Sequence, residues 1–208
     1  GLSFQTSLAF HQGQLWMHRD DNVGLVTVLE PSGTLVRRFS SSVPNLGQLQ
    51  SNGSVLRGAQ FWFQELSADG GVRRIPGLMN AQASAPGQAG VWYVFAARDP
   101  NDGGFATEPR QLFRVEADES FTPVAGDVTK TTDSDGPALT AGITTMQKLT
   151  VAPDGTVSFL GAKNQLRQLR NGQVTTLMTF SDTPLDLVAL SDGSLVVAVD
   201  AAFLHVFP

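Results

Sequence analysis

The chain has no cysteine, one tyrosine and three histidines among its 208 residues. The lack of cysteine excludes disulfides, thiol catalysis and thiolate metal sites, although it does not decide the compartment. No G-x-S-x-G, H-E-x-x-H or P-loop pattern is present. No apolar run approaches the roughly 20 residues that a membrane-spanning helix needs, so we expect no membrane insertion.

Charge is also scarce. Only 16% of the residues are charged, and 14 basic against 19 acidic residues give a formal net charge of −5. An acidic chain without basic patches is a poor candidate for binding nucleic acid, and we expect no such partner. The 41% hydrophobic content is enough for a sizeable core, and 21 glycines with 11 prolines suit a turn-rich β protein.

The segment 135–177 contains every part of one repeating structural unit. Short runs with alternating apolar residues occupy 147–152, 156–161, 165–169 and 173–177. Asp154-Gly155 and Asn171-Gly172 separate them, and such dipeptides favour tight hairpin turns. Four antiparallel strands within about forty residues are typical of one blade of a β-propeller.

Looser copies of this unit recur along the chain. The turn glycines Gly13, Gly53, Gly90, Gly155 and Gly193 are spaced by 40, 37, 65 and 38 residues. Most of these spacings are near the ~40-residue period of a propeller blade. We therefore predict an all-β fold, a single small propeller over 1–208 with about five blades of four antiparallel strands. The predicted blades are 6–40, 45–76, 80–126, 146–178 and 183–208.

The clearest unit resembles the NHL type of propeller repeat. The resemblance rests on Asp135-Gly136-Pro137-Ala138, Leu149 to Gly155, Asn164 to Leu169 and Val174-Thr175-Thr176. The second strand departs from the family pattern, because Ser158-Phe159-Leu160-Gly161 stands where an aromatic-apolar-Ala-Asp run is usual. The resemblance implies a propeller, and it is weaker in the other four blades.

The last blade lacks an outer strand, because the sequence ends at Pro208. Propellers often complete such a blade with a strand from the N-terminus. Residues Leu2 to Gln5 could supply it if their connection to Leu8 is tight. We favour this closure, because an open sheet edge promotes aggregation; otherwise the blade has three strands or the chain is part of a larger propeller.

Two insertions interrupt the third blade, at 98–109 and 126–145. One joins strands two and three and the other joins strand four to the next blade. Since antiparallel strands reverse at each turn, both should emerge on one face. Long loops on a rigid scaffold often carry binding function. We predict that shortening both would leave the fold intact and abolish binding.

The candidate binding residues come mainly from these insertions. They are Arg98, Asp99, Asp102, Phe105, Asp133 and Asp135, with Trp62 from the Phe61-Trp62-Phe63 run. Asp133-Ser134-Asp135-Gly136 begins like a calcium loop, but position twelve is Thr144 rather than Glu, and a structural turn explains it better. Trp62 would lie in a seam between blades or anchor a sugar ring or a protein partner.

The sequence favours a non-enzymatic binding or scaffold module. It would bind a protein, a polar ligand or a glycan through one loop face, in an extracytoplasmic location. We assign no catalytic residue, metal or cofactor. The alternatives are a hydrolase or lactonase with a metal in the channel, and a lectin-like sugar binder. The inner strands offer few metal ligands, since their polar residues include Gln82, Lys148, Thr150 and Asp186.

Overall fold

The structure is a computed structural model that describes residues 5–20, 24–40, 48–59, 62–99 and 109–207. Of these residues 59% lie in strands and 3% in helices, so the fold is all-β as predicted. The chain forms two compact units, 1–81 with 98–106 and 82–97 with 107–208. Within the described part, no helix is long and apolar enough to cross a membrane.

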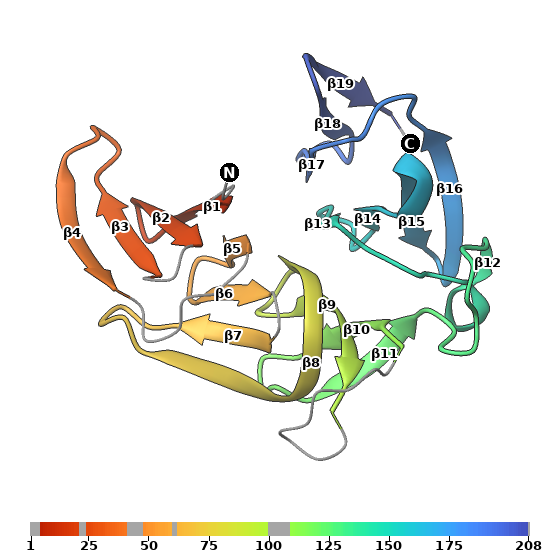
Figure 1. Cartoon of the computed structure of the whole chain (residues 1–208), viewed down its shortest axis with the longest axis horizontal. Helices are drawn as coiled ribbons and strands as arrows, with labels where there is room; N and C mark the ends of the chain where they lie inside the picture. The colour runs from red at the N-terminus through yellow and green to blue at the C-terminus, as the bar shows by residue number, and fades with distance from the viewer. Residues whose placement is uncertain (1–4, 21–23, 41–47, 60–61, 100–108, 208) are drawn as a thin grey trace. The chain divides into compact units, whose positions relative to one another are not determined.

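Unit 1 begins with an antiparallel sheet of four strands, shown in red and orange in Figure 1. They are β1 (Gln5–His11), β2 (Gln14–Asp20), β3 (Leu25–Leu29) and β4 (Leu35–Ser40). The next strands are β5 (Gln48–Ser51), β6 (Leu56–Ala59) and β7 (Trp62–Leu66). Successive side chains of a strand point to opposite faces of the sheet, so every second side chain of these strands faces inward. The inward-facing side chains form one core cluster. This cluster includes Trp16, Val26, Val28, Leu49, Leu56 and Leu66.

Strand β8 (Val72–Pro86) differs from the prediction. The predicted boundary between blades falls between residues 76 and 80, but the structure continues through it as one strand of 15 residues. The pairing of β7 with β8 is irregular between Trp62 and Gln64, and Gly77 has φ +78°. An irregular ladder with a glycine bends a strand without ending it, so β8 begins in unit 1 and ends in unit 2.

Unit 2 continues with β9 (Trp92–Arg98), β10 (Gln111–Val115) and β11 (Phe121–Ala125). A second sheet comprises β13 (Lys148–Val151), β14 (Val157–Leu160), β15 (Gln165–Arg170) and β16 (Gln173–Thr179). The strands of this sheet match the four predicted runs, shifted by at most two residues at their ends. Gly155 and Gly193 have φ +85° and +86°, which confirms the predicted turns.

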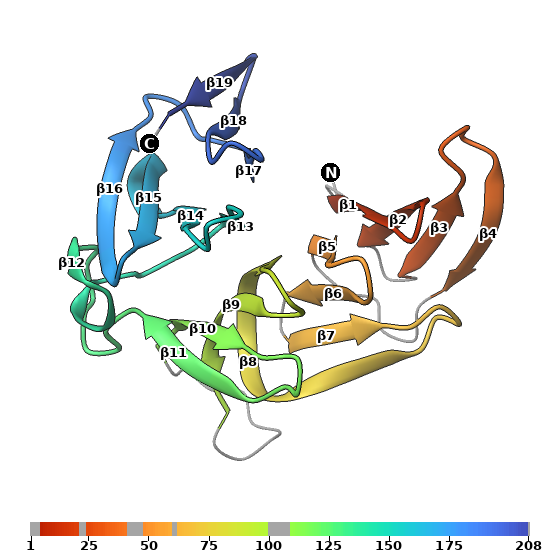
Figure 2. The same ribbon diagram turned by 180° about the vertical axis from the view of Figure 1, so that it is seen from behind.

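The second insertion adds structure that the sequence did not predict. Residues Gly136–Pro137 form β12, which pairs with the outer strand β16, and Ala138–Thr140 form the 3-10 helix η1. Figure 2 shows β12 beside β16 from behind. The short helix η2 (Ala162–Asn164) links β14 to β15. Apolar residues from η1 and the sheets share a core that includes Ala83, Phe95, Leu112, Ala138, Met146 and Phe159.

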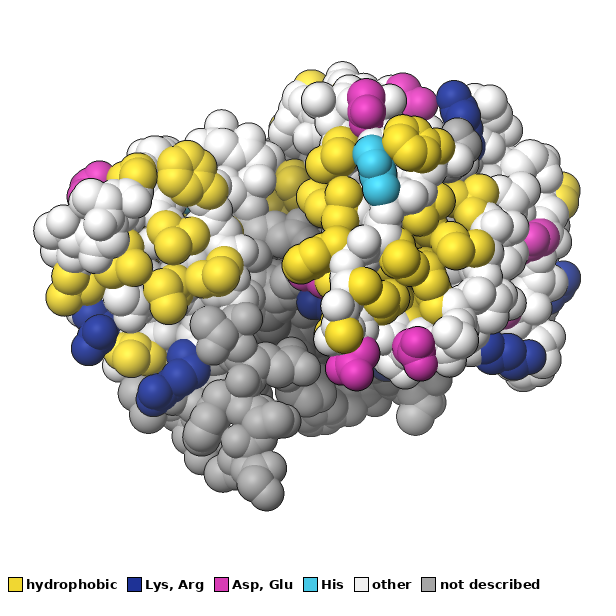
Figure 3. Space-filling view, turned by 90° about the horizontal axis from the view of Figure 1, so that it is seen from above, with side chains coloured by type: hydrophobic (Ala, Val, Ile, Leu, Met, Phe, Trp, Pro, Cys, Tyr) yellow, Lys and Arg dark blue, Asp and Glu magenta, His cyan; other side chains and the backbone are white. Residues whose placement is uncertain are grey.

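The last sheet has three strands, β17 (Asp186–Ala189), β18 (Leu195–Val199) and β19 (Ala202–Val206). Leu187 and Val197 on its inner face pack against Leu160 and Leu166 of the preceding sheet. Its outer face carries exposed apolar side chains, and Figure 3 shows them gathered around a histidine. The main members of this face are Val188, Phe203 and Phe207.

The predicted closing strand falls partly outside the described residues, which do not include Leu2 to Phe4. Gln5 belongs to β1 and pairs with Asp20, so it is part of the first strand and not of a separate closing strand. The four sheets contain four, seven, five and three strands. This grouping does not confirm five blades of four strands each.

Candidate functional site

Two predicted binding residues, Asp133 and Asp135, surround a buried arginine. The side chain of Arg167 on β15 is 1% exposed. Its Nη2 donates to Asp135 Oδ1 at 3.0 Å and to the carbonyl of Ser134 at 2.8 Å, and its Nη1 donates to the carbonyl of Gly142 at 2.8 Å. Asp133 Oδ2 lies 3.9 Å from Nη1. The guanidinium therefore ties the second insertion to the sheet.

Two threonines also donate hydrogen bonds to these carboxylates. Asp133 Oδ1 accepts from the backbone and hydroxyl of Thr144 at 2.8 and 2.7 Å. Asp135 accepts from the backbone and hydroxyl of Thr176 at 2.8 and 2.9 Å. Partial burial raises the pKa of Asp135, but the bonds from Thr176 and Arg167 outweigh it, so its pKa lies below the ordinary value. The D-x-D-G segment thus has a structural role.

Of the other predicted residues, the structure describes Trp62, Arg98 and Asp99. Trp62 is half-buried, and the guanidinium of Arg74 lies 3.7 Å from its ring centroid, so Arg74 covers one face of the ring. Arg98 is exposed, whereas Asp99 is buried and its backbone N–H donates to Gly77. Asp102 and Phe105 lie outside the described residues. The prediction that both insertions share one face therefore stays a prediction.

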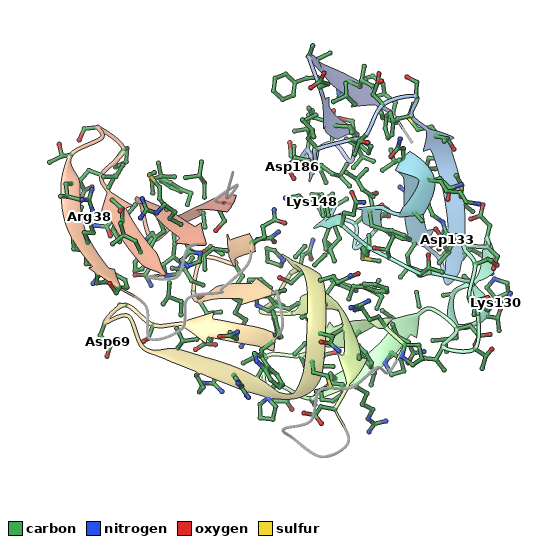
Figure 4. The ribbon with its side chains drawn as sticks, in the orientation of Figure 1. Arg38, Asp69, Lys130, Asp133, Lys148 and Asp186 are labelled. Carbon is green, nitrogen blue, oxygen red and sulfur yellow. The ribbon has the colours of Figure 1, made fainter. Side chains whose placement is uncertain are left out.

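A polar set lies where the inner strands of unit 2 begin. Lys148 Nζ is 3.8 Å from Asp186 Oδ1, and these residues open β13 and β17. Figure 4 shows the two side chains meeting between their strands. Nearby in the chain, Thr145 Oγ1 donates to Gln82 Oε1 at 3.4 Å. We call Gln82, Thr145, Lys148 and Asp186 the inner-edge set. Lys148 and Asp186 keep 30% and 58% of their side-chain surface exposed, so a ligand can reach them.

A contact between serine and histidine at the last sheet resembles a hydrolase triad only superficially. His205 Nε2 lies 2.7 Å from Ser194 Oγ, but Ser194 donates to Asp192 at 2.6 Å. In a triad the carboxylate orients the histidine instead. The hydrogen bond from a serine hydroxyl to the aspartate two residues earlier recurs in another turn, between Ser120 and Asp118. The bond between Ser194 and Asp192 therefore stabilises a turn and is no sign of a catalytic triad.

A cleft of about 490 Å³ opens at the opposite end of the unit 2 sheets, where the hairpin turns lie. Its polar lining comprises Tyr93, Arg114, Asp154, Thr156, Arg170 and Asn171, with the glycines Gly155 and Gly172. We call it the turn cleft. Two smaller cavities of about 160 and 180 Å³ adjoin it, and Asp154 lines all three.

The charges in the turn cleft come from exposed groups. Arg170 Nη2 lies 3.6 Å from Asp154 Oδ2. Hydrogen bonds from the backbone and hydroxyl of Thr156 lower the pKa of Asp154, and the charge of Arg170 lowers it further. The sequence indicates Asp154-Gly155 and Asn171-Gly172 only as turns. It gives no sign of the cleft, because Tyr93 and Arg114 reach these turns only through the packing of two sheets.

No three histidine, aspartate or glutamate side chains in the described ranges lie close enough together to hold a metal ion. The inner-edge set contains one carboxylate, Asp186. Within the part of the chain that the structure describes, the donors therefore do not fit the channel metal of the lactonase alternative.

No protein-family model matches the chain, and no curated protein matches it in sequence. Several solved structures are similar to it. A protein provisionally described as a gluconolactonase matches with TM-score 0.66 and 10% identity, over 100% of this chain and 76% of that one. A gluconolactonase from Xanthomonas campestris matches with TM-score 0.63 and 15% identity, over 97% and 75%. A streptogramin B lyase matches with TM-score 0.61 and 13% identity, over 99% and 64%.

These similarities show a propeller-like all-β fold, as the sequence predicts. They do not confirm the NHL type of repeat. The chain spans about three quarters of the two gluconolactonases and under two thirds of the lyase. Identities of 10–15% support the fold and leave the activity open.

Proposed function

We propose that this chain hydrolyses a small cyclic ester of the sugar-lactone class at the inner-edge set. The observation that carries the proposal is the pairing of Lys148 with Asp186 at 3.8 Å on neighbouring inner strands. The gluconolactonase descriptions of two similar structures support this alternative over the scaffold function. The substrate class is inferred from those proteins and from the polar character of the set.

Hydrolysis of a lactone needs a base for water and a positive group for the developing oxyanion. Asp186 would take a proton from a water molecule while the water oxygen forms a bond to the carbonyl carbon of the lactone. The Lys148 ammonium would stabilise the negative charge on the carbonyl oxygen. The tetrahedral carbon then expels the ring oxygen, which takes the proton from Asp186, and the ring opens to a hydroxy acid. No metal enters these steps.

The test is hydrolysis of glucono-1,5-lactone, followed as acid release against the spontaneous rate. Asp186→Asn and Lys148→Met should each lower kcat/KM by about 10²-fold or more. The matched controls are Asp182→Asn and Lys163→Met, which change exposed residues outside the set. Both controls should keep the parent rate, and a chelator should leave it unchanged.

A rate no higher than the spontaneous one would refute lactone hydrolysis by this chain. Activity that disappears with a chelator, or that survives both substitutions, would refute the roles of Lys148 and Asp186. Circular dichroism of each variant separates lost chemistry from lost folding.

A non-enzymatic binding module is the second candidate function. The observation that favours it is the exposed outer face of the last sheet, where Phe203 and Phe207 are 80% and 75% exposed. An exposed apolar patch is typical of a protein interface. This function predicts no turnover of any lactone. The extracytoplasmic location stays a prediction under either function.

A further inference from the structure

We propose that the turn cleft is a binding site for a hydroxylated carboxylate, a sugar acid with one negative charge. Its volume of about 490 Å³ lies in the range of small-molecule sites. The lining combines two cations, one anion, an amide and one aromatic ring. The whole chain has a net charge of −5, so an anion would need a local group of cations such as this one.

The two arginines provide the carboxylate site. Arg114 and Arg170 reach the cleft from β10 and β15, which belong to different sheets. Arg114 Nε lies 3.1 Å from Glu116, and Arg170 lies 3.6 Å from Asp154. All four side chains are about half exposed, so these ion pairs contribute little stability and can open. A guanidinium binds a carboxylate through two parallel hydrogen bonds, which gives geometric selectivity.

The remaining lining suits a ring with hydroxyl groups. Asp154 can accept hydrogen bonds from hydroxyls, and the amide of Asn171 can both donate and accept. A Cβ atom added at Gly155 or Gly172 would meet nothing within 4 Å, so the turn backbones stand open to a ligand. The half-buried ring of Tyr93 provides an apolar wall beside Val157. Aromatic rings in this role commonly pack against sugar rings.

The charges around the turn cleft favour a monoanion. Arg114 pairs with Glu116 and Arg170 with Asp154, so the four side chains carry no net charge, and a ligand carboxylate would bind a guanidinium by displacing its partner. One carboxylate fits this exchange, whereas a polyphosphate would bring several negative charges without a cation for each.

This inference does not rest on the proposed hydrolysis. The inner-edge set lies where β13 and β17 begin, whereas the turn cleft lies at the turns that follow β13 and β15. Substitutions at one end therefore leave the other intact, and binding is measured without turnover.

The experiment is calorimetric titration of the full chain with D-glucuronate, and with D-glucose, which lacks the carboxylate. Glucuronate should bind saturably and glucose at least tenfold more weakly. Arg114→Met and Arg170→Met should each raise the glucuronate Kd by tenfold or more, and Tyr93→Ala by about fivefold. The control Arg38→Met removes an exposed arginine of unit 1 and should leave the Kd unchanged.

Three results would overturn the proposal. They are no saturable binding of glucuronate, equal affinity for glucose, and an unchanged Kd in both arginine variants. Should a variant fold poorly, the chemical shift changes that glucuronate causes in the parent protein decide instead. Shifts at Tyr93 and Gly172 would support the cleft, and shifts confined to other residues would refute it.

Discussion

Arg167 Nη2 donates to Asp135 Oδ1 at 3.0 Å across 32 residues of sequence. Arg167 lies on β15, and Asp135 directly precedes β12 in the second insertion. The buried guanidinium also binds the carbonyls of Ser134 and Gly142. A buried charge with several hydrogen bonds is stable only when all partners are in place. This relationship makes the insertion part of the folded sheet.

Asp135→Asn should lower the free energy of unfolding by about 1–3 kcal/mol, because Arg167 would keep a weaker neutral partner. The magnitude is moderate since the Asp135 side chain is 45% exposed. Urea unfolding of Asp135→Asn, Arg167→Met and the double variant gives the coupling energy. A coupling energy near zero would contradict the role assigned to this pair.

The lowered pKa of Asp135 predicts acid sensitivity. Its folded-state pKa lies below the ordinary value of 3.8, so its contribution is fully present above that value. The contribution should be lost as pH falls through the lowered folded pKa. The stability difference between the parent and Asp135→Asn should therefore shrink between pH 5 and pH 2, in unfolding experiments at each pH. A difference that does not depend on pH would refute this linkage.

Substitution by alanine should lower the stability of the chain by different amounts at Gly142 and Gly155. A Cβ at Gly142 would overlap the carbonyl oxygen of Thr132, and backbone cannot move aside cheaply. Gly142→Ala should cost about 3 kcal/mol or more. Gly155 has φ +85° but open space around it, so Gly155→Ala should cost only about 1–2 kcal/mol of strain. Thermal unfolding of both variants checks the order, and the reverse order would contradict it.

Shortening residues 126–145 to a tight turn should unfold the chain or leave it molten. The sequence predicts the opposite outcome for this insertion, but the structure shows that it holds the partners of Arg167 and the buried Ala138. Deleting it would leave a buried charge unpaired. Near-ultraviolet circular dichroism is the measurement. A shortened chain with native signal and cooperative melting would contradict this prediction.

Much of the local structure could be predicted from the sequence. Alternating apolar residues set the strands of 147–177, because successive side chains face opposite sides of a sheet. The Asp-Gly dipeptides set the hairpin turns, because glycine adopts the positive φ that Gly155 and Gly193 show. These signals act over a few residues, so one sequence is enough to read them.

Tertiary structure alone decided the sites. Lys148 pairs with Asp186, and Tyr93 lines one cleft with Arg170, because separate sheets pack together. No local pattern encodes such contacts. The same holds for Asp133 and Asp135, which pair with the buried Arg167 on β15. Short-range preferences of backbone and side chains set the strands and turns, so these elements could be predicted from one sequence. Long-range packing decided which polar groups meet, because contact energies depend on positions that only the folded chain defines.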